Sequence, residues 1–136
     1  MRRRRSLLPT VLATAIALML GAPLVAQAAV PTPLSTSGSR IVDANGNTVV
    51  LQGVNWFGFE TANHAPHGLW ARDYRSMLAQ IRGQGFNTIR LPFSLEMIGA
   101  STTSGIDYSG GRNAALAGKS PIRVMDEIIA EAARND

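Results

Sequence analysis

The sequence predicts an α/β fold with a parallel sheet, and only the first units of such a fold. An amphipathic helical pattern at 72–84 leads directly into a short apolar strand at 87–91, and a second helical pattern begins at Ser120. Strands that alternate with helices pair in parallel, because the helix carries the chain back along the sheet. The expected order is hairpin, strand, loop, helix, strand, loop, helix.

Residues 1–28 are predicted to be a secretory signal peptide. Arginines at 2–5 form a basic start, residues 7–25 are mostly apolar, and Ala-Gln-Ala at 26–28 offers a cleavage site of small residues. The alternative, a membrane anchor, needs about 20 uninterrupted apolar residues, and two prolines and a glycine interrupt this run. We therefore expect a secreted product that has no membrane contact after cleavage.

Removal of this segment changes the charge of the chain. The sequence has 13 basic and 9 acidic residues, and four of the basic ones are the arginines at 2–5. The remaining nine basic residues balance the nine acidic ones, so no nucleic-acid partner is expected. The absence of cysteine excludes a disulfide framework and a thiolate metal site within this sequence.

The mature chain is expected to begin with a flexible lead and a hairpin. Residues 29–39 are rich in Pro, Ser and Thr, which is typical of a flexible segment. The β-prone runs 40–42 and 48–51 flank an Asn-Gly pair, which favours the positive φ angles of a tight turn. Asp43 stands at this turn, and we interpret it as a turn former and not as a catalyst.

Aromatic residues and two histidines follow the next expected strand. Trp56 has two interpretations: a core residue, or a platform on which a sugar ring stacks. Phe57 and Phe59 are expected to pack. His64 and His67 have no third ligand at a recognisable spacing, so neither a metal site nor a cofactor is expected. A hydrogen-bonding or substrate-rim role is expected for His67, and ordinary loop structure for His64.

Two helices carry apolar stripes. The stripe of the first contains Tyr74, Met77, Leu78 and Ile81, and that of the second Met125, Ile128, Ile129 and Ala132. Asp73 is well placed at the positive end of the first helix, while Arg75 and Arg82 are expected to be solvated. The first stripe is expected to pack on the strand at 87–91.

Arg90 is the unusual residue of that strand. A buried cation needs a carboxylate or a ligand, because an unpaired buried ion is costly. Its place near the end of a strand that precedes the long, glycine-rich loop at 93–119 is typical of the catalytic rim of a β/α barrel. The alternative is a structural salt bridge at a strand end. Two βα units cannot close such a barrel, which needs eight.

Four stretches together resemble the N-terminal part of family 5 glycoside hydrolases, and most closely secreted bacterial endoglucanases (cellulases) of that family. They are VNWFGFE at 54–60, HGLW at 67–70, RDY at 72–74 and NTIRLP at 87–92. The resemblance runs from about Ser37 to the end of the chain. It implies that residues 40–136 are the truncated N-terminal part of a (β/α)₈ TIM barrel, here a hairpin and about two βα units.

The resemblance implies cleavage of a β-1,4-glucan such as cellulose with retention of configuration. Retention needs two carboxyl groups about 5–5.5 Å apart, and in the family these glutamates follow the fourth and seventh strands, beyond this chain. The fragment alone is therefore predicted to be inactive. Arg90 matches the arginine that hydrogen-bonds the nucleophilic glutamate, and Trp56 and His67 match positions near the cleft. These three are the candidate substrate-binding residues.

Other interpretations remain. Glu60, Glu96 and Asp107 lie in rim loops, but flexible loops hold two carboxyl groups poorly at a fixed separation, and we interpret Glu60 as a loop-ordering acceptor. The chain is alternatively a truncated, non-catalytic remnant that binds glycans weakly through Trp56 and Trp70, or part of a relative that acts on another β-glycan such as mannan. The full-length enzyme is expected to be a monomer that acts on a β-glucan polysaccharide.

Overall fold

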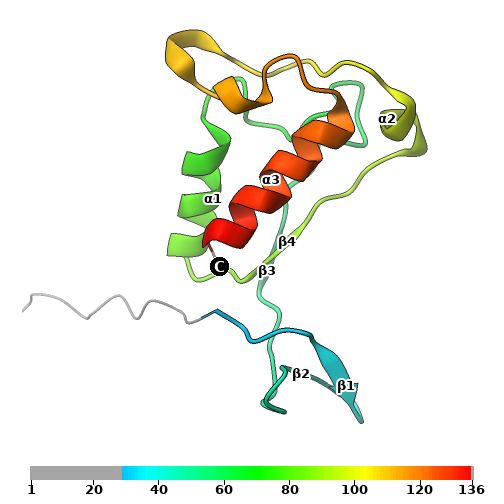
Figure 1. Cartoon of the computed structure of the whole chain (residues 1–136), viewed down its shortest axis with the longest axis vertical. Coiled ribbons are helices and arrows are strands. Elements are labelled where there is room, and N and C mark those ends of the chain that lie inside the picture. The colour runs from blue at the N-terminus through cyan, green and yellow to red at the C-terminus, as the bar shows by residue number, and fades with distance from the viewer. Residues whose placement is uncertain (1–28, 136) are drawn as a thin grey trace, which may run out of the picture.

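A computed structural model describes residues 29–135, so the predicted signal peptide lies outside the described residues. Figure 1 shows two helices side by side in front of a pair of strands, with a separate small pair of strands at the N-terminal end. The elements, in chain order, are β1 (Ser35–Ser37), β2 (Arg40–Val42), β3 (Gly53–Asn55), α1 (Tyr74–Gly83), β4 (Thr88–Arg90), α2 (Leu95–Gly99), the 3₁₀ turns Ser109–Gly111 and Ala114–Leu116, and α3 (Pro121–Asn135).

The predicted parallel pairing is confirmed by β3 and β4. Gly53 is opposite Thr88, Val54 opposite Ile89, and Asn55 opposite Arg90. Helix α1 lies between the two strands in the sequence, as expected for a crossover connection. The two C-terminal strand ends therefore lie at the same edge, where the loops 56–73 and 91–120 begin.

The hairpin prediction is correct at its turn and wrong in the length of its strands. Asp43 Oδ1 accepts hydrogen bonds from the backbone N–H groups of Asn45 and Asn47, each over 2.9 Å, so Asp43 is the turn former that we expected. Beyond the turn, the ladder consists of one bridge between Val42 and Thr48 and a hydrogen bond from Val49 N to Ile41 O.

The hairpin is short because Asn87 binds the following segment. Its Oδ1 accepts from Gln52 N over 2.8 Å, and its Nδ2 donates to Val50 O over 2.9 Å. Residues 50–52 are thus held at the start of β4 instead of beside β2. The partner of β2 is β1, which runs antiparallel to it. Part of the segment expected to be a flexible lead, residues 35–37, therefore forms a strand.

Helix α1 starts and ends as the sequence indicates. Asp73 is its N-cap and accepts from Arg75 N over 2.9 Å. Gly85, at φ 87°, lies just beyond its C-cap Gln84. Tyr74 and Leu78 are buried on its inner face.

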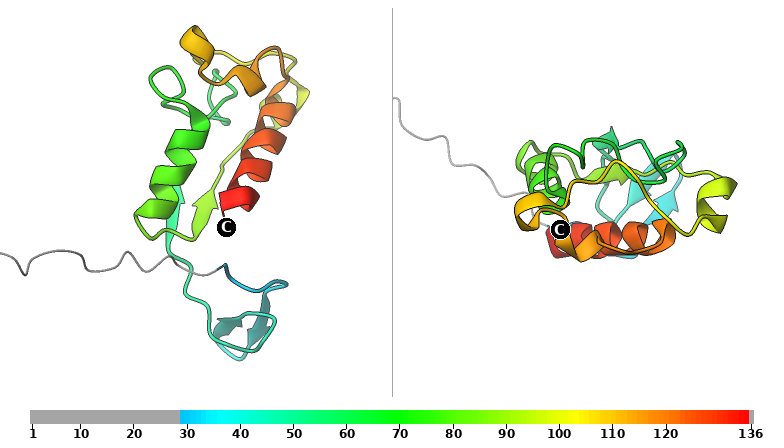
Figure 2. Two further views of the ribbon diagram at one scale, coloured as in Figure 1. Left: turned by 60° about the vertical axis from the view of Figure 1, so that its left-hand side comes forward. Right: turned by 90° about the horizontal axis from the view of Figure 1, so that it is seen from above.

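Helix α3 packs against α1, and the left view of Figure 2 shows β4 running between the two helices. The buried positions of α3 are Pro121, Val124 and Ile128, whereas Ile129, expected in the apolar stripe, is 53% exposed. The core contains Trp56, Phe59, Leu69, Tyr74, Leu78, Met97, Leu116, Val124 and Ile128. It therefore combines both helices with the two long loops.

Arg75 is exposed, as expected, and its side chain also makes two contacts on the helix surface. Its guanidinium carbon lies 4.6 Å from the centroid of the Tyr74 ring, and its Nε lies 3.4 Å from Glu131 Oε2 of α3. Helix packing creates this contact, because it brings residues more than fifty positions apart onto one surface.

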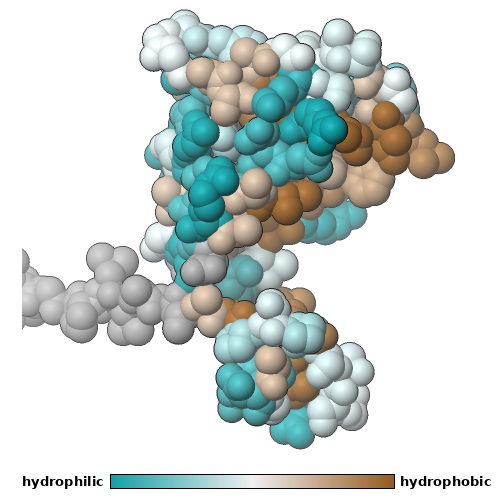
Figure 3. All heavy atoms as spheres, viewed as in Figure 1, coloured by the Kyte–Doolittle hydropathy of each residue, from teal (hydrophilic) through white to brown (hydrophobic). Residues whose placement is uncertain are grey.

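The long loop at 93–119 contains local structure. Ser94 caps the short helix α2 by accepting from Met97 N over 3.1 Å, and Met97 is fully buried. Leu95 of the same helix is 86% exposed, and Figure 3 shows apolar surface at α2 and beside α3. Within residues 29–135, no helix is both long enough and apolar enough to cross a membrane.

Candidate active-site edge at the ends of β3 and β4

Arg90 and Asn55 occupy the C-terminal ends of the two parallel strands. Arg90 Nη1 donates to Asn55 Oδ1 over 2.8 Å, and Arg90 O accepts from Trp56 N over 3.0 Å. Arg90 is exposed, so it is not the buried cation that the apolar strand suggested. Among residues 29–135, the side chain of Arg90 bonds to an amide and not to a carboxylate. The alternative of a structural salt bridge at the strand end is therefore not observed within these residues.

Trp56 is a core residue in this structure. It is 5% exposed, and its indole Nε1 donates to His67 O over 2.8 Å. Both the apolar ring and its polar N–H are therefore satisfied within the protein. Of the two interpretations of Trp56, the structure favours the core over the sugar-stacking platform.

Three ring side chains of loop 56–73, two of them exposed, lie together, and we call Phe57, His67 and Trp70 the aromatic group. The His67 ring centroid lies 4.6 Å from that of Phe57 and 5.2 Å from that of Trp70, both in edge-on geometry. Phe57 is 47% exposed and Trp70 54% exposed, so Phe57 is not the packed residue that we expected. The largest exposed ring of the group is Trp70.

Hydrogen bonds fix the orientation of His67. Its Nε2 lies 3.3 Å from Thr61 Oγ1 and 3.2 Å from Asn63 Oδ1. The Thr61 hydroxyl donates its hydrogen to Gly58 O, so it does not donate to Nε2. The other partner of Nε2, Asn63 Oδ1, is an amide oxygen that only accepts. We therefore assign the ring hydrogen to Nε2. His67 has the hydrogen-bonding role that the sequence suggested, directed toward its own loop.

Gly58 allows the loop to fold back against the strand end. Its φ is 135°, and a Cβ at this position would lie 2.3 Å from Ala65 O and 2.6 Å from His67 N. A larger residue would displace the segment that carries His67. The loop returns here through a backbone hydrogen bond from His67 N to Phe57 O over 2.9 Å.

The acidic residues of the rim loops each have a structural contact. Glu60 Oε2 accepts from Gly58 N over 2.8 Å, which confirms its interpretation as a loop-ordering acceptor. Glu96 has a side chain that is 82% exposed, and its Oε1 lies 3.8 Å from His64 Nε2. Hydrogen bonds from Ser109, with the nearby Arg112 guanidinium, lower the pKa of Asp107 below its ordinary value. In the part of the chain that the structure describes, His, Asp and Glu form no group of three that could hold a metal ion.

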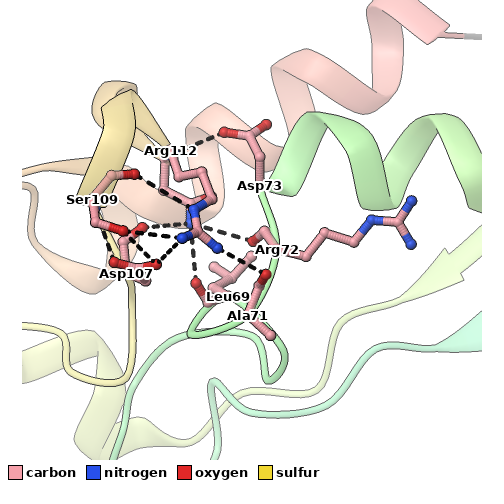
Figure 4. Close-up of polar contacts among 8 residues, drawn as sticks. Leu69, Ala71, Arg72, Asp73, Asp107, Ser109 and Arg112 are labelled. Atoms are coloured by element: carbon pink, nitrogen blue, oxygen red, sulfur yellow. Dashed lines mark hydrogen bonds and ion pairs between the residues drawn. The ribbon is translucent and has the colours of Figure 1, made fainter.

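Asn113 is the polar residue of this region that the sequence analysis missed. Its side chain is fully buried, its backbone adopts φ 48°, and its Nδ2 and Oδ1 contact loop 56–73 and the first turn of α1. Figure 4 shows the neighbouring contacts of Asp73, Asp107 and Arg112. An asparagine within a glycine-rich loop is a typical sign of a left-handed backbone position, but apart from Asp107 O its side-chain partners are about forty residues away.

The comparison with known families agrees with this arrangement of strands, loops and helices. Residues 42–136 match the family described as cellulase, glycosyl hydrolase family 5. The chain belongs to glycosyl hydrolase family 5.

Curated relatives and solved structures are similar over most of the chain. The major extracellular endoglucanase of Xanthomonas campestris is 46% identical over 120 residues, which cover 87% of this chain and 24% of that protein. An endoglucanase of Paenibacillus polymyxa is 43% identical over 98 residues, or 71% of this chain and 24% of that protein. The chain therefore spans about a quarter of the length of these relatives.

Two solved structures share the same part of the fold. The catalytic domain of the Xanthomonas campestris enzyme has a TM-score of 0.68 at 45% identity, covering 76% of this chain and 30% of that chain. A cellotetraose complex of a variant endocellulase from Pyrococcus horikoshii has a TM-score of 0.68 at 42% identity, covering 75% of this chain and 28% of that chain. Both are endo-acting cellulases by name.

Proposed function

We propose that this chain is the N-terminal portion of a secreted, retaining glycoside hydrolase that cleaves internal β-1,4 bonds of cellulose. The observation that carries the proposal is the Asn55–Arg90 contact at the C-terminal ends of the parallel strands. In β/α barrels, residues at this end of the strands perform the chemistry, while residues at the opposite end stabilise the fold. The endoglucanase relatives support the choice of reaction.

Arg90 binds and orients a carboxylate in this proposal. A guanidinium carries five N–H donors in a planar fork, and one nitrogen of Arg90 is held by Asn55. The fork matches the two oxygens of a carboxylate, and a nearby positive charge favours the ionised form. Arg90 thereby keeps the nucleophilic glutamate charged and correctly oriented.

Both catalytic glutamates lie beyond residues 1–136 in this proposal. The carboxylates near the strand ends already serve the loops, as Glu60 and Asp107 do. Retention requires a nucleophile and an acid/base about 5–5.5 Å apart, held on rigid elements. Later strands of a complete (β/α)₈ barrel supply such elements.

The aromatic group supplies the binding surface for the glucan. Trp70 exposes a large ring, and an aromatic face matches the apolar face of a glucose unit. His67 supports this ring from the side. We assign substrate binding to Trp70 and Arg90, with His67 as the neighbour of Trp70. Trp56 acts beneath them as a core residue.

Secretion is part of the same proposal. It is supported by the signal-like sequence at 1–28 and by the printed name of the Xanthomonas relative, a major extracellular endoglucanase. An insoluble polysaccharide cannot enter a cell, so the enzyme has to reach it outside.

The test compares the 136-residue chain with any longer product of the same reading frame. We expect the chain to bind cellotetraose weakly and to release no reducing sugar from carboxymethylcellulose. The longer product should hydrolyse it and release the β-anomer first, as observed by NMR. Hydrolysis by the 136-residue chain would contradict the placement of both glutamates. Cleavage of mannan but not of cellulose by the longer product would support the alternative substrate, and a stop codon after Asp136 would support the non-catalytic remnant.

A further inference from the structure

We propose that the segment 107–113, which we call the buttress, positions Trp70 for glycan binding by holding the backbone on both sides of it. The inference rests on the proposed function for its purpose. The statement that the buttress fixes the position of Trp70 rests only on hydrogen bonds and burial. It assigns positioning roles to Arg112 and Asn113, neither of which belongs to the aromatic group.

Asn113 holds the carbonyl groups on either side of Trp70. Its Nδ2 lies 3.0 Å from Asp107 O, 3.1 Å from Leu69 O and 3.3 Å from Arg72 O, and its two hydrogens are shared among these three carbonyl groups. Leu69 O also accepts from Asp107 N over 3.0 Å. The two peptide groups that bracket the Trp70–Ala71 pair are therefore bound to the buttress.

Arg112 holds the carbonyl between these two. Its Nη1 donates to Ala71 O over 3.0 Å. The guanidinium is itself positioned by Asp107, whose Oδ2 lies 2.9 Å from Nη2, and by Ser109 Oγ, which accepts from Nη2 over 3.0 Å. Figure 4 shows this guanidinium between Asp107 and Ser109 on one side and Ala71 on the other.

Asn113 is rigidly held, so it can fix the position of the backbone at 69–72 that it contacts. Its side chain is fully buried, and its Oδ1 accepts from Tyr74 N over 2.9 Å. Its backbone N–H donates to Asp73 Oδ2 over 2.7 Å. The buttress is thereby attached to the first turn of α1, a rigid element, and not only to another loop.

The Trp70 ring depends on this support because its own packing is slight. Trp70 is 54% exposed, and its ring contact is with His67 over 5.2 Å between centroids. Leu69, directly before it, is fully buried. The direction of the indole therefore follows from the backbone at 69–72. A binding group fixed in advance binds more tightly, since less freedom is lost on association.

The test uses the full chain labelled with 5-fluorotryptophan, which gives two fluorine signals, from Trp56 and Trp70, assigned with Trp70→Phe. Asn113→Gly removes the side chain while a left-handed backbone remains accessible. Arg112→Gln removes a partly exposed guanidinium and is the milder variant. Arg123→Gln, a charge on the surface of α3 that pairs with Asp126, is the matched control.

We expect Asn113→Gly and Arg112→Gln to shift or broaden the Trp70 signal while the Trp56 signal stays in place, and Arg123→Gln to change neither. The affinity for cellotetraose should fall about tenfold, as expected when a preorganised group becomes mobile. An unchanged Trp70 signal in both variants would overturn the inference. Joint movement of both signals in Arg112→Gln would overturn it too, because it would indicate a general effect on folding. If Asn113→Gly unfolds the chain, the Trp70 signal of Arg112→Gln decides whether the inference holds.

The signals are recorded without ligand, so the two proposals fail separately. If Trp70 loses its position in the variants but the unmodified chain does not bind cellotetraose, the buttress is correct and the binding role of Trp70 is wrong. If Trp70→Ala weakens cellotetraose binding but neither buttress variant changes the Trp70 signal, the binding role of Trp70 is correct and the buttress proposal is wrong.

Discussion

Arg90 and Asn55 are register partners on adjacent parallel strands, and Arg90 Nη1 also donates to Asn55 Oδ1 over 2.8 Å. The backbone pairing sets the distance between the two Cα atoms, and the amide then limits the directions that the long arginine side chain can take. A residue that orients a nucleophile needs such a limit, because misplaced groups lose much of their effect.

Replacement of Arg90 should affect turnover more than stability. In the proposed full-length enzyme, Arg90→Ala should lower kcat on carboxymethylcellulose about 10²–10³-fold, the range typical for loss of a preorganised polar group. Arg90→Lys should recover only part of this, because an ammonium lacks the planar fork. Arg123→Ala, on the outer side of α3, serves as the control. Wild-type turnover of Arg90→Ala would refute the assigned role.

Asn55 should act through Arg90. Asn55→Ala leaves the guanidinium in place but removes its amide partner, so kcat should fall less than in Arg90→Ala, by about tenfold. The double variant should be no slower than Arg90→Ala alone, because both changes interrupt one interaction. Additive losses in kcat would show instead that Asn55 acts independently of Arg90.

Trp70 should contribute to glycan affinity. Trp70→Ala is expected to weaken cellotetraose binding by about 2 kcal/mol, or roughly 30-fold, as for an exposed tryptophan at the centre of an interface. Isothermal titration calorimetry measures this directly. Leu95→Ala, which truncates the 86% exposed Leu95, should leave the affinity unchanged. Equal affinities of Trp70→Ala and the parent would contradict the binding role.

Gly58 should tolerate no side chain. Gly58→Ala places a Cβ 2.3 Å from Ala65 O, so it should lower the free energy of unfolding by about 3 kcal/mol. Gly46 also has positive φ, at 83°, but has no atom within 4 Å of such a Cβ. Gly46→Ala should therefore cost only about 1–2 kcal/mol. Urea denaturation of both variants checks the comparison, and equal losses would contradict the steric argument.

The ion pair of Asp107 should make stability depend on pH. Hydrogen bonds from Ser109 and the charge of Arg112 hold its pKa below the ordinary 3.8 in the folded chain. A lowered folded pKa adds stability above the unfolded pKa, and this stability is lost as pH falls through the folded pKa. The Tm advantage of the parent over Asp107→Asn should thus be full above about pH 5 and vanish in stronger acid.

The matched control for this pH series is Asp126→Asn. Asp126 lies on the exposed surface of α3 and pairs with Arg123 within the same helix. It should change Tm little at any pH, as is usual for an exposed pair. A Tm difference between the parent and Asp107→Asn that persists unchanged into acid would contradict the proposed linkage.

Local features of the fold could be predicted because their causes are local. Asp73 at the start of α1, the glycine end of α1 and the turn at Asp43 each depend on a few neighbouring residues. The apolar spacing of α1 predicted its inner face for the same reason. Prediction was less accurate for α3, where Ile129 is exposed, because helical spacing leaves the orientation of an apolar stripe uncertain by about one position.

The candidate site was predicted only in part. Arg90 stood out as a charge in an apolar strand, and the family resemblance added Trp56 and His67. The burial of Trp56 and the exposure of Phe57 and Trp70 depend on how loop 56–73 folds back over Gly58. No periodicity describes such a loop, so its inner and outer residues could not be separated from the sequence.

The sequence by itself determined the family, the succession of β3, α1, β4 and α3, the turn at Asp43 and the glycine end of α1, and it singled out Arg90 as a candidate. These follow from short-range stereochemistry and from residue patterns that survive without a structure. Tertiary structure alone decided that Asn55 is the partner of Arg90, that Arg75 reaches Glu131, and that Asn113 holds the backbone around Trp70. Each of these contacts joins residues at least 35 positions apart, and only packing of the complete chain selects one partner for a polar group among the many that its chemistry allows.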